Sequence, residues 1–188
     1  MQPDVILFDD IDRDGPQRRS AVLEIPASAL DSEDVVALGP VSIEVTAADG
    51  EARGEYVADG AVEYTADLTC ARCVDPYPFA NRSTFHLTFA PRPEGPAPPS
   101  DDVELASEDD LDTEFYTERQ IPLRDLAAEQ IQLTIPMKPL CDERCLGLCP
   151  QCGRNRNREE CSCQPEAADE RWGALKDFRQ ELLKKRES

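Results

Sequence analysis

Residues 82–89 read Arg-Ser-Thr-Phe-His-Leu-Thr-Phe, with polar and apolar side chains in near-perfect alternation. A period of two is typical of a β-strand that buries one face. One face of this strand carries Ser83, Phe85, Leu87 and Phe89, and the other carries Thr84, His86 and Thr88. Strands are also indicated at residues 20–25, 41–46, 55–57 and 61–69. The first half of the chain therefore predicts an antiparallel meander.

Turn and helix signals complete this prediction. Asp59-Gly60 stands between two of the strands and predicts a hairpin turn. Residues 114–120 predict a further strand, and Pro122 predicts the start of a helix over 122–134. The residues at helical spacing are Leu123, Leu126, Ala127, Gln130 and Ile131. The expected fold class is α+β, with an antiparallel sheet, for which barrel-like closure is one option, and few helices.

The chain divides by composition into two predicted domains. Residues 1–140 form a β-rich domain, interrupted at 91–112 by a proline-rich and then acidic stretch that predicts a loop. Residues 141–188 predict a module rich in cysteine, whose thiols can bind a metal ion such as zinc, followed by a C-terminal helix. That helix would begin near Asp169 and bury a stripe of Trp172, Leu175, Phe178 and Leu182.

Charge is distributed unevenly between these parts. The 188 residues include 39 acidic and 20 basic side chains, for a net charge of −19. Residues 141–188 contain ten of each sign, so the whole net charge lies in 1–140. Such a surface disfavours non-specific binding to nucleic acid, which needs Lys and Arg. Two interpretations remain: the acids keep the protein in solution, or the acidic part and the neutral part of the chain face different partners.

No stretch approaches the roughly 20 apolar residues of a membrane helix, so no membrane partner is expected. The apolar run at residues 5–8 is short, is followed by two aspartates and lacks the features of a secretory signal. A cytoplasmic location is therefore expected. In that reducing compartment, dense cysteine indicates metal binding rather than disulfides.

The eight cysteines fall in four close pairs, and paired thiolates on separate turns suit a tetrahedral zinc ion. Proximity predicts two zinc sites. One uses Cys149, Cys152, Cys161 and Cys163, and the other uses Cys70, Cys73, Cys141 and Cys145. Two alternatives stay open: a single site made by Cys141, Cys145, Cys149 and Cys152, and disulfide or redox chemistry.

No catalytic set is visible, and four thiolates leave zinc no open position for a substrate, so the protein is not expected to be an enzyme. The functional alternative is a thiol-based redox enzyme or sensor that uses Cys70 and Cys73. The only histidine, His86, lies on the polar face of its strand. Three arginines inside the second cysteine module are candidates for RNA contact: Arg154, Arg156 and Arg158.

Several motifs occur together in one order. Residues 68–74 read Leu-Thr-Cys-Ala-Arg-Cys-Val; 121–140 precede the second group of cysteines; and 147–155 read Gly-Leu-Cys-Pro-Gln-Cys-Gly-Arg-Asn. The ending Arg-Trp-Gly-Ala-Leu-Lys at 171–176 also fits. From about residue 20 onward, the chain resembles the YceD family of bacteria and plastids, which is named for accumulation of the large ribosomal RNA subunit.

The resemblance implies a zinc-binding, non-enzymatic factor in the synthesis, processing or stability of large-subunit (23S) ribosomal RNA. Its partners would be that RNA or assembly intermediates, and the family's gene often lies beside that of a small large-subunit ribosomal protein. Some family members keep the first cysteine group but lack the second, which favours two separate sites. This chain departs from the family pattern at Arg156, where an aliphatic residue is usual, and in its longer acidic linker.

Overall fold

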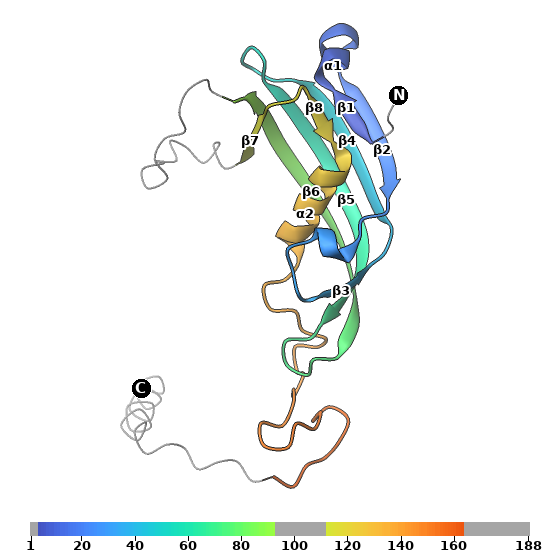
Figure 1. Ribbon diagram of the computed structural model, residues 1–188, viewed down its shortest axis with the longest axis vertical. Coiled ribbons are helices and arrows are strands. Elements are labelled where there is room, and N and C mark those ends of the chain that lie inside the picture. The colour runs from blue at the N-terminus through green and yellow to red at the C-terminus, as the bar shows by residue number, and fades with distance from the viewer. Residues whose placement is uncertain (1–3, 93–111, 164–188) are drawn as a thin grey trace, which may run out of the picture. The chain divides into compact units, whose positions relative to one another are not determined.

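The computed structural model describes residues 4–92 and 112–163 (Figure 1). Contacts divide the chain into two compact units, with the boundary between Cys145 and Leu146. The first unit contains every regular strand and helix of the described residues. The second unit begins at Leu146 and is described as far as Cys163. The sequence-based boundary at residue 140 stays a prediction.

A six-stranded sheet forms the first unit and confirms the α+β prediction. Strands β2 (Gln17–Leu23), β4 (Val41–Asp49), β5 (Tyr56–Thr69) and β6 (Pro76–Pro91) are antiparallel neighbours in that order. Strand β3 (Val35–Leu38) pairs with the end of β5, beyond the reach of β4. Strand β7 (Thr113–Tyr116) joins the far side of β6, where it runs parallel.

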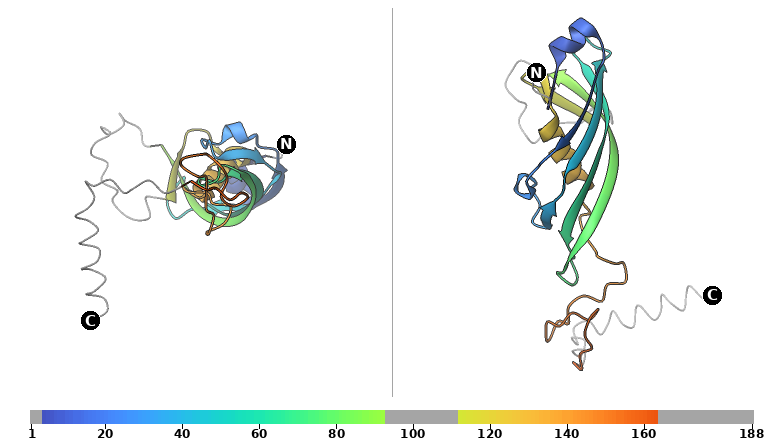
Figure 2. Two further views of the ribbon diagram at one scale, coloured as in Figure 1. Left: turned by 90° about the horizontal axis from the view of Figure 1, so that it is seen from below. Right: turned by 90° about the vertical axis from the view of Figure 1, so that its right-hand side faces the viewer.

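The sheet does not close into a barrel, which corrects one option of the prediction. Strands β2 and β7 are the two ends of the strand order, and no pairing joins them among the described residues. The helix α2 (Leu123–Thr134) packs on β4, β5 and β6 instead (Figure 1). The right-hand view of Figure 2 shows the sheet curving around this helix. One helix therefore covers the concave face, which side chains from the surrounding strands would fill in a closed barrel.

Helix α2 confirms the helix prediction in its bounds and its buried face. The buried side chains are Leu123, Leu126, Ala127, Gln130 and Ile131, the set expected from helical spacing. The helix ends at Thr134, whose hydroxyl lies 3.0 Å from the buried Tyr64 hydroxyl of β5. A polar contact therefore fixes the end of the helix over the middle of the sheet.

Two short elements at the N-terminus were not predicted. Strand β1 (Val5–Leu7) pairs with β8 (Gln120–Pro122) in a separate two-stranded sheet, and α1 (Phe8–Asp14) follows. The ring of Phe8 is fully buried and stacks on Tyr56, with centroids 4.0 Å apart. The guanidinium of Arg119 bridges Asp9 and Asp12 of α1 at 2.8 and 2.6 Å. The expected strand at 114–120 is thus two short strands, β7 and β8, in different sheets.

The predicted turn at Asp59-Gly60 is wrong, because both residues lie inside the continuous strand β5. Their register is unbroken: Asp59 pairs with Thr46 and His86, and Gly60 pairs with Val45 and Phe85. A Cβ atom at residue 60 would collide with the ring of Phe85 and the carbonyl oxygen of Glu44. Glycine is therefore required at residue 60 because neighbouring strands place atoms where a Cβ would lie. It is not required for the positive φ of a turn.

Two expectations lie outside the described residues: the acidic part of the linker at 93–111 and the C-terminal helix with Trp172, Leu175, Phe178 and Leu182. Within 4–92 and 112–163, neither helix has the length and apolar content that membrane crossing requires.

Candidate metal centre

The first cysteine cluster (Cys70, Cys73, Cys141 and Cys145) begins in the turn between β5 and β6. The amide of Cys70 donates to the carbonyl of Asp75 at 3.0 Å, and the amide of Val74 donates to the carbonyl of Cys70 at 2.9 Å. Val74 adopts a φ of 61°, an uncommon value for a β-branched residue. This tight turn places the sulfurs of Cys70 and Cys73 on the same side of the hairpin end.

The segment that follows α2 supplies the other two cysteines. The amide of Ala71 donates to the carbonyl of Pro139 at 2.8 Å, which fixes this segment against the hairpin turn. The guanidinium of Arg72 donates from Nη1 to the carbonyls of Glu143 and Cys145, both at 2.9 Å. Backbone and side-chain hydrogen bonds thus join two segments that lie about seventy residues apart in the sequence.

The sulfur positions of the first cluster fit a tetrahedral metal ion. The Sγ atoms of Cys70 and Cys145 are 3.9 Å apart, those of Cys73 and Cys141 are 3.7 Å apart, and all four lie within 4.8 Å of one another. A tetrahedron with zinc–sulfur bonds of about 2.3 Å has sulfur–sulfur edges of about 3.8 Å. The cluster can therefore hold a metal ion, and none of its cysteines forms a disulfide.

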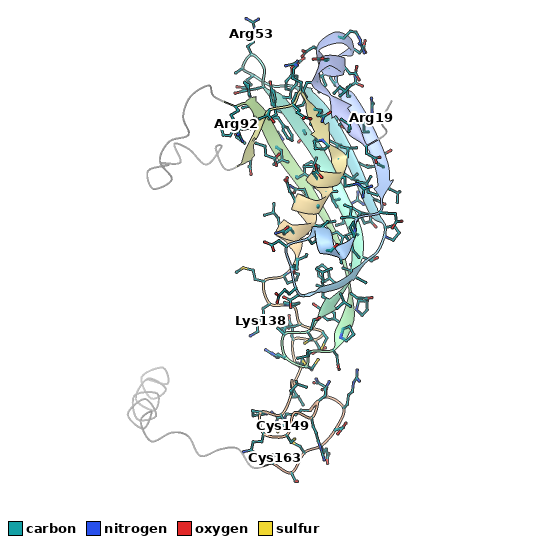
Figure 3. All side chains as sticks on the ribbon, in the orientation of Figure 1. Arg19, Arg53, Arg92, Lys138, Cys149 and Cys163 are labelled. Carbon is teal, nitrogen blue, oxygen red and sulfur yellow. The ribbon has the colours of Figure 1, made fainter. Side chains whose placement is uncertain are left out.

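The second cysteine cluster (Cys149, Cys152, Cys161 and Cys163) lies in the second unit and also has its four sulfurs within 4.8 Å of one another. Figure 3 shows Cys149 and Cys163 lying close together. The amide of Gly153 donates to the carbonyl of Cys149 at 2.8 Å, and Gly153 has a φ of 71°. The turn at 149–153 therefore closes through a glycine just after the second cysteine.

Asparagine side chains organise the loop around this second cluster. The Oδ1 of Asn157 accepts from the amide of Leu146 at 2.7 Å, and the Oδ1 of Asn155 accepts from the amide of Asn157 at 3.0 Å. The backbone of Asn155 also forms a bridge with Leu148. These contacts explain how a loop without regular strands or helices can hold four sulfurs together, since its polar groups bind one another.

Each cluster contains one thiol that is acidified by backbone amides. Burial alone would raise the pKa of Cys70, but amides of Cys141, Cys73 and Arg72 donate to its sulfur and lower the pKa to about 6. Amides of Cys152 and Gln151 lower the pKa of Cys149 to about 6 in the same way. Thiolates are the form that binds metal, so each cluster has one ligand ready at neutral pH.

The remaining candidate residues are exposed. Arg154, Arg156 and Arg158 lie on the surface of the second unit, and Arg154 forms a long ion pair of 3.9 Å with Glu159. His86 is exposed on β6, where its Nδ1 lies 2.8 Å from Oδ1 of Asp59, and it belongs to neither cysteine cluster. Sequence reasoning missed Arg72 as part of the first cluster. Its place between two cysteines in Cys-Ala-Arg-Cys was the available signal.

The two cysteine clusters and the hairpin that carries the first of them lie within one stretch of the chain that matches a known family. The model of the family described as large ribosomal RNA subunit accumulation protein YceD matches residues 58–179, which is more than half of the chain. The chain belongs to the YceD family. The match runs from β5 through both cysteine clusters.

Two curated plant proteins are similar to this chain. The maize protein named large ribosomal RNA subunit accumulation protein YCED homolog 1, chloroplastic, is 30% identical over 179 residues, covering 83% of this chain and 59% of the maize protein. The Arabidopsis thaliana protein of the same name is 35% identical over 63 residues, covering 34% of this chain and 18% of its own length. This YceD chain therefore spans less than two thirds of those relatives. No solved structure matches it significantly.

The contacts of Arg72 predict that Arg72→Ala weakens metal binding at the first cluster of this YceD chain by roughly tenfold. Groups that orient metal ligands typically contribute tenfold or more to affinity, and Arg72 holds the backbone that carries Cys145. Competition with a chromophoric chelator measures the affinity. Arg53→Ala is the matched control, because Arg53 is exposed on the hairpin at the other end of the sheet (Figure 3). Equal affinities of the two variants would contradict the role of Arg72.

Proposed function

We propose that this chain is a non-enzymatic zinc-binding factor that supports the synthesis, processing or stability of large-subunit (23S) ribosomal RNA. The observation that carries the proposal is the presence of two four-cysteine clusters in a YceD-family chain. Four thiolates in a tetrahedron favour zinc and complete its coordination, which suits a structural ion. We propose two ions, held by Cys70, Cys73, Cys141 and Cys145 and by Cys149, Cys152, Cys161 and Cys163. The reducing cytoplasm would keep these thiolates available.

The proposed RNA contact is the arginine group of the second unit: Arg154, Arg156 and Arg158. All three side chains are exposed, and the residues 141–188 carry no net charge to repel phosphates. The loop that carries them is supported by the amide of Arg156, which donates to the carbonyl of Gly147 at 2.9 Å. Guanidinium groups on a fixed loop can bind phosphate through two parallel hydrogen bonds.

A basic ribosomal protein is the proposed protein partner. Residues 1–140 carry the whole net charge of −19. A surface of this sign attracts Lys- and Arg-rich proteins and speeds their encounter at low salt. Residues 1–140 would thus bind a basic protein, whereas the loop that carries Arg154, Arg156 and Arg158 would bind RNA.

The redox alternative rests on one observation, the pKa of about 6 at Cys70, which is also what a nucleophilic thiol requires. Burial opposes this alternative, because Cys70 is 0% exposed and Cys73 is 3% exposed. A substrate disulfide has to reach the attacking sulfur. The grouping of four sulfurs, rather than two, also favours a metal ion.

The deciding experiment combines zinc analysis with measurement of ribosomal RNA. Purified protein is expected to contain about two zinc ions per chain, because each closed tetrahedron takes one ion. A strain that lacks the protein is expected to accumulate less mature 23S RNA relative to 16S RNA, and restoring the gene should correct the ratio. Folded, reduced protein without zinc would exclude the metal proposal. An unchanged 23S to 16S ratio at every growth temperature would exclude the ribosomal one.

A further inference from the structure

Strand β6 has one edge that is largely unpaired. Along its inner edge, residues from Pro76 to Phe89 pair with β5 without a register shift. Along its outer edge, β7 pairs only with the four residues from Thr88 to Pro91. No other described strand pairs with residues 76–87 on that side. Among the described residues, more than half of this sixteen-residue strand therefore has no strand beside its outer edge.

The register identifies which backbone groups face outward. Cys70 and Asp75 form a hydrogen-bonded pair at the hairpin end, and bonded and non-bonded pairs alternate along an antiparallel ladder. Residues 77, 79, 81, 83, 85 and 87 therefore bond to β5, whereas the even-numbered residues direct their backbone groups away from it. Two of those positions, Pro76 and Pro78, lack an amide proton, as is common for prolines on an edge strand. The outward donors are the amides of Ala80, Arg82, Thr84 and His86.

The side chains beside this edge include apolar groups that are only partly covered. Phe79 and Phe85 face the core side of β6, where both are half-buried against the hydrophobic core. Phe115 of the neighbouring β7 is 55% exposed. A further strand on β6 would cover the flanks of the first two rings and bury apolar surface that water now contacts.

Carboxylates without a cationic partner lie at the β7 end of the edge. Glu114 is on β7 and Glu129 is on α2, and neither forms an ion pair with a described residue. Burial and the adjacent Glu129 carboxyl raise the pKa of Glu114 to about 7. Two facing carboxylates repel each other when both are ionised, and a Lys or Arg side chain placed between them removes that repulsion.

We propose that the outer edge of β6 between Ala80 and His86 receives a β-strand from a Lys- and Arg-bearing segment of a partner protein. The inference rests on the basic protein partner of the proposed function and names the surface that binds it. Main-chain hydrogen bonds supply the docking, and the carboxylates near β7 select a basic sequence. A second copy of this chain fits less well, because two chains of −19 repel each other.

A direct test uses a synthetic seven-residue peptide of alternating Val with Lys or Arg. Titration into the zinc-loaded, isotope-labelled full chain should shift the amide resonances of Ala80, Arg82, Thr84 and His86. The same peptide with N-methylated backbone amides keeps its charge but cannot pair as a strand, and a Glu-for-Lys/Arg peptide keeps the pairing but reverses the charge. Both control peptides should bind at least about tenfold more weakly.

Variants of the chain complete the test. Thr84→Pro removes an outward amide while the ladder to β5 keeps its bonds, and Thr84→Ala is the matched control that keeps the amide. Proline should weaken peptide binding at least about tenfold, and alanine should leave it within about twofold. Ala80→Pro provides a second variant if Thr84→Pro is unfolded by circular dichroism. Zinc content is measured on the same samples, so failure of the metal proposal is recognised separately from failure of strand docking.

Any of these results would overturn the inference: no peptide binding at millimolar concentration, equal binding of the N-methylated peptide, unchanged binding by both folded proline variants, or slow hydrogen exchange of the four amides in the protein alone. The last would mean that the chain itself already covers the edge. A different result would be that the protein alone sediments as a dimer that Thr84→Pro dissociates. That result would assign the edge to a second copy of the chain and would equally overturn the proposal of a basic partner protein.

Discussion

Protein carrying Cys70→Ser and Cys73→Ser is expected to lose one zinc ion and to melt roughly 10 °C below the wild type. The metal at the first cluster would cross-link residues 68 to 75 positions apart in the chain. Closing a loop of that length stabilises the folded state by about 4 kcal/mol on the chain-entropy model. For a chain of this size, each kcal/mol shifts the melting temperature by about 2–4 °C. Calorimetry and zinc analysis of the same preparations measure both effects.

The matched control is the double variant Cys149→Ser and Cys152→Ser. It should lose the other zinc ion and leave the melting of the β-rich unit unchanged within about 2 °C, because the second cluster lies wholly within the second unit. A loss of both ions in either double variant would mean that the two clusters share ligands. Equal melting of all three proteins, with the expected zinc losses, would show that the first metal does not hold the sheet together.

Phe8→Ala is expected to lower the free energy of unfolding by about 3–5 kcal/mol. The ring is fully buried, stacks on Tyr56 and forms a T-shaped pair with Tyr116, with ring centroids 4.8 Å apart. Its removal therefore leaves a cavity where α1 meets the sheet. Urea unfolding followed by circular dichroism measures the change. Phe115→Ala makes the same chemical change at a side chain that is 55% exposed, and should cost less than about 1 kcal/mol. Similar losses in the two variants would contradict the packing described for Phe8.

Local patterns predicted most of the central fold. The alternation at residues 82–89 and 41–46 follows from burial of one face of a sheet, and the structure places Leu87, Val41 and Val45 on that buried face. The helix at 122–134 was equally visible, because Pro122 and the apolar spacing act within a few turns. Proximity in the sequence grouped Cys149 and Cys152 with Cys161 and Cys163. The other two pairs, Cys70/Cys73 and Cys141/Cys145, were then grouped by elimination.

Features that depend on distant contacts could not be read from the sequence. Gly60 has the residue type of a turn, and only the position of the Phe85 ring reveals why a glycine stands there. The pairing of β1 with β8 joins Val5 to Pro122, and three-residue strands carry no local signal of their partner. The parallel alignment of β7 with β6 likewise depends on where the intervening chain returns. Sequence patterns report burial well and report the identity of the neighbour poorly.

The joining of the chain's beginning to the region around residue 120 has a consequence for its own synthesis. The side chain of Arg119 binds that of Asp9, 110 residues earlier in the chain. Strand β1 cannot pair until β8, at a similar separation in the sequence, has been made. A ribosome that makes this protein must therefore reach residue 120 before the segment at residues 5–14 can be buried. Until then Ile6, Phe8 and Ile11, all essentially inaccessible in the folded protein, are exposed on the nascent chain. Transiently exposed apolar segments of this kind are the surface that chaperones recognise on nascent chains.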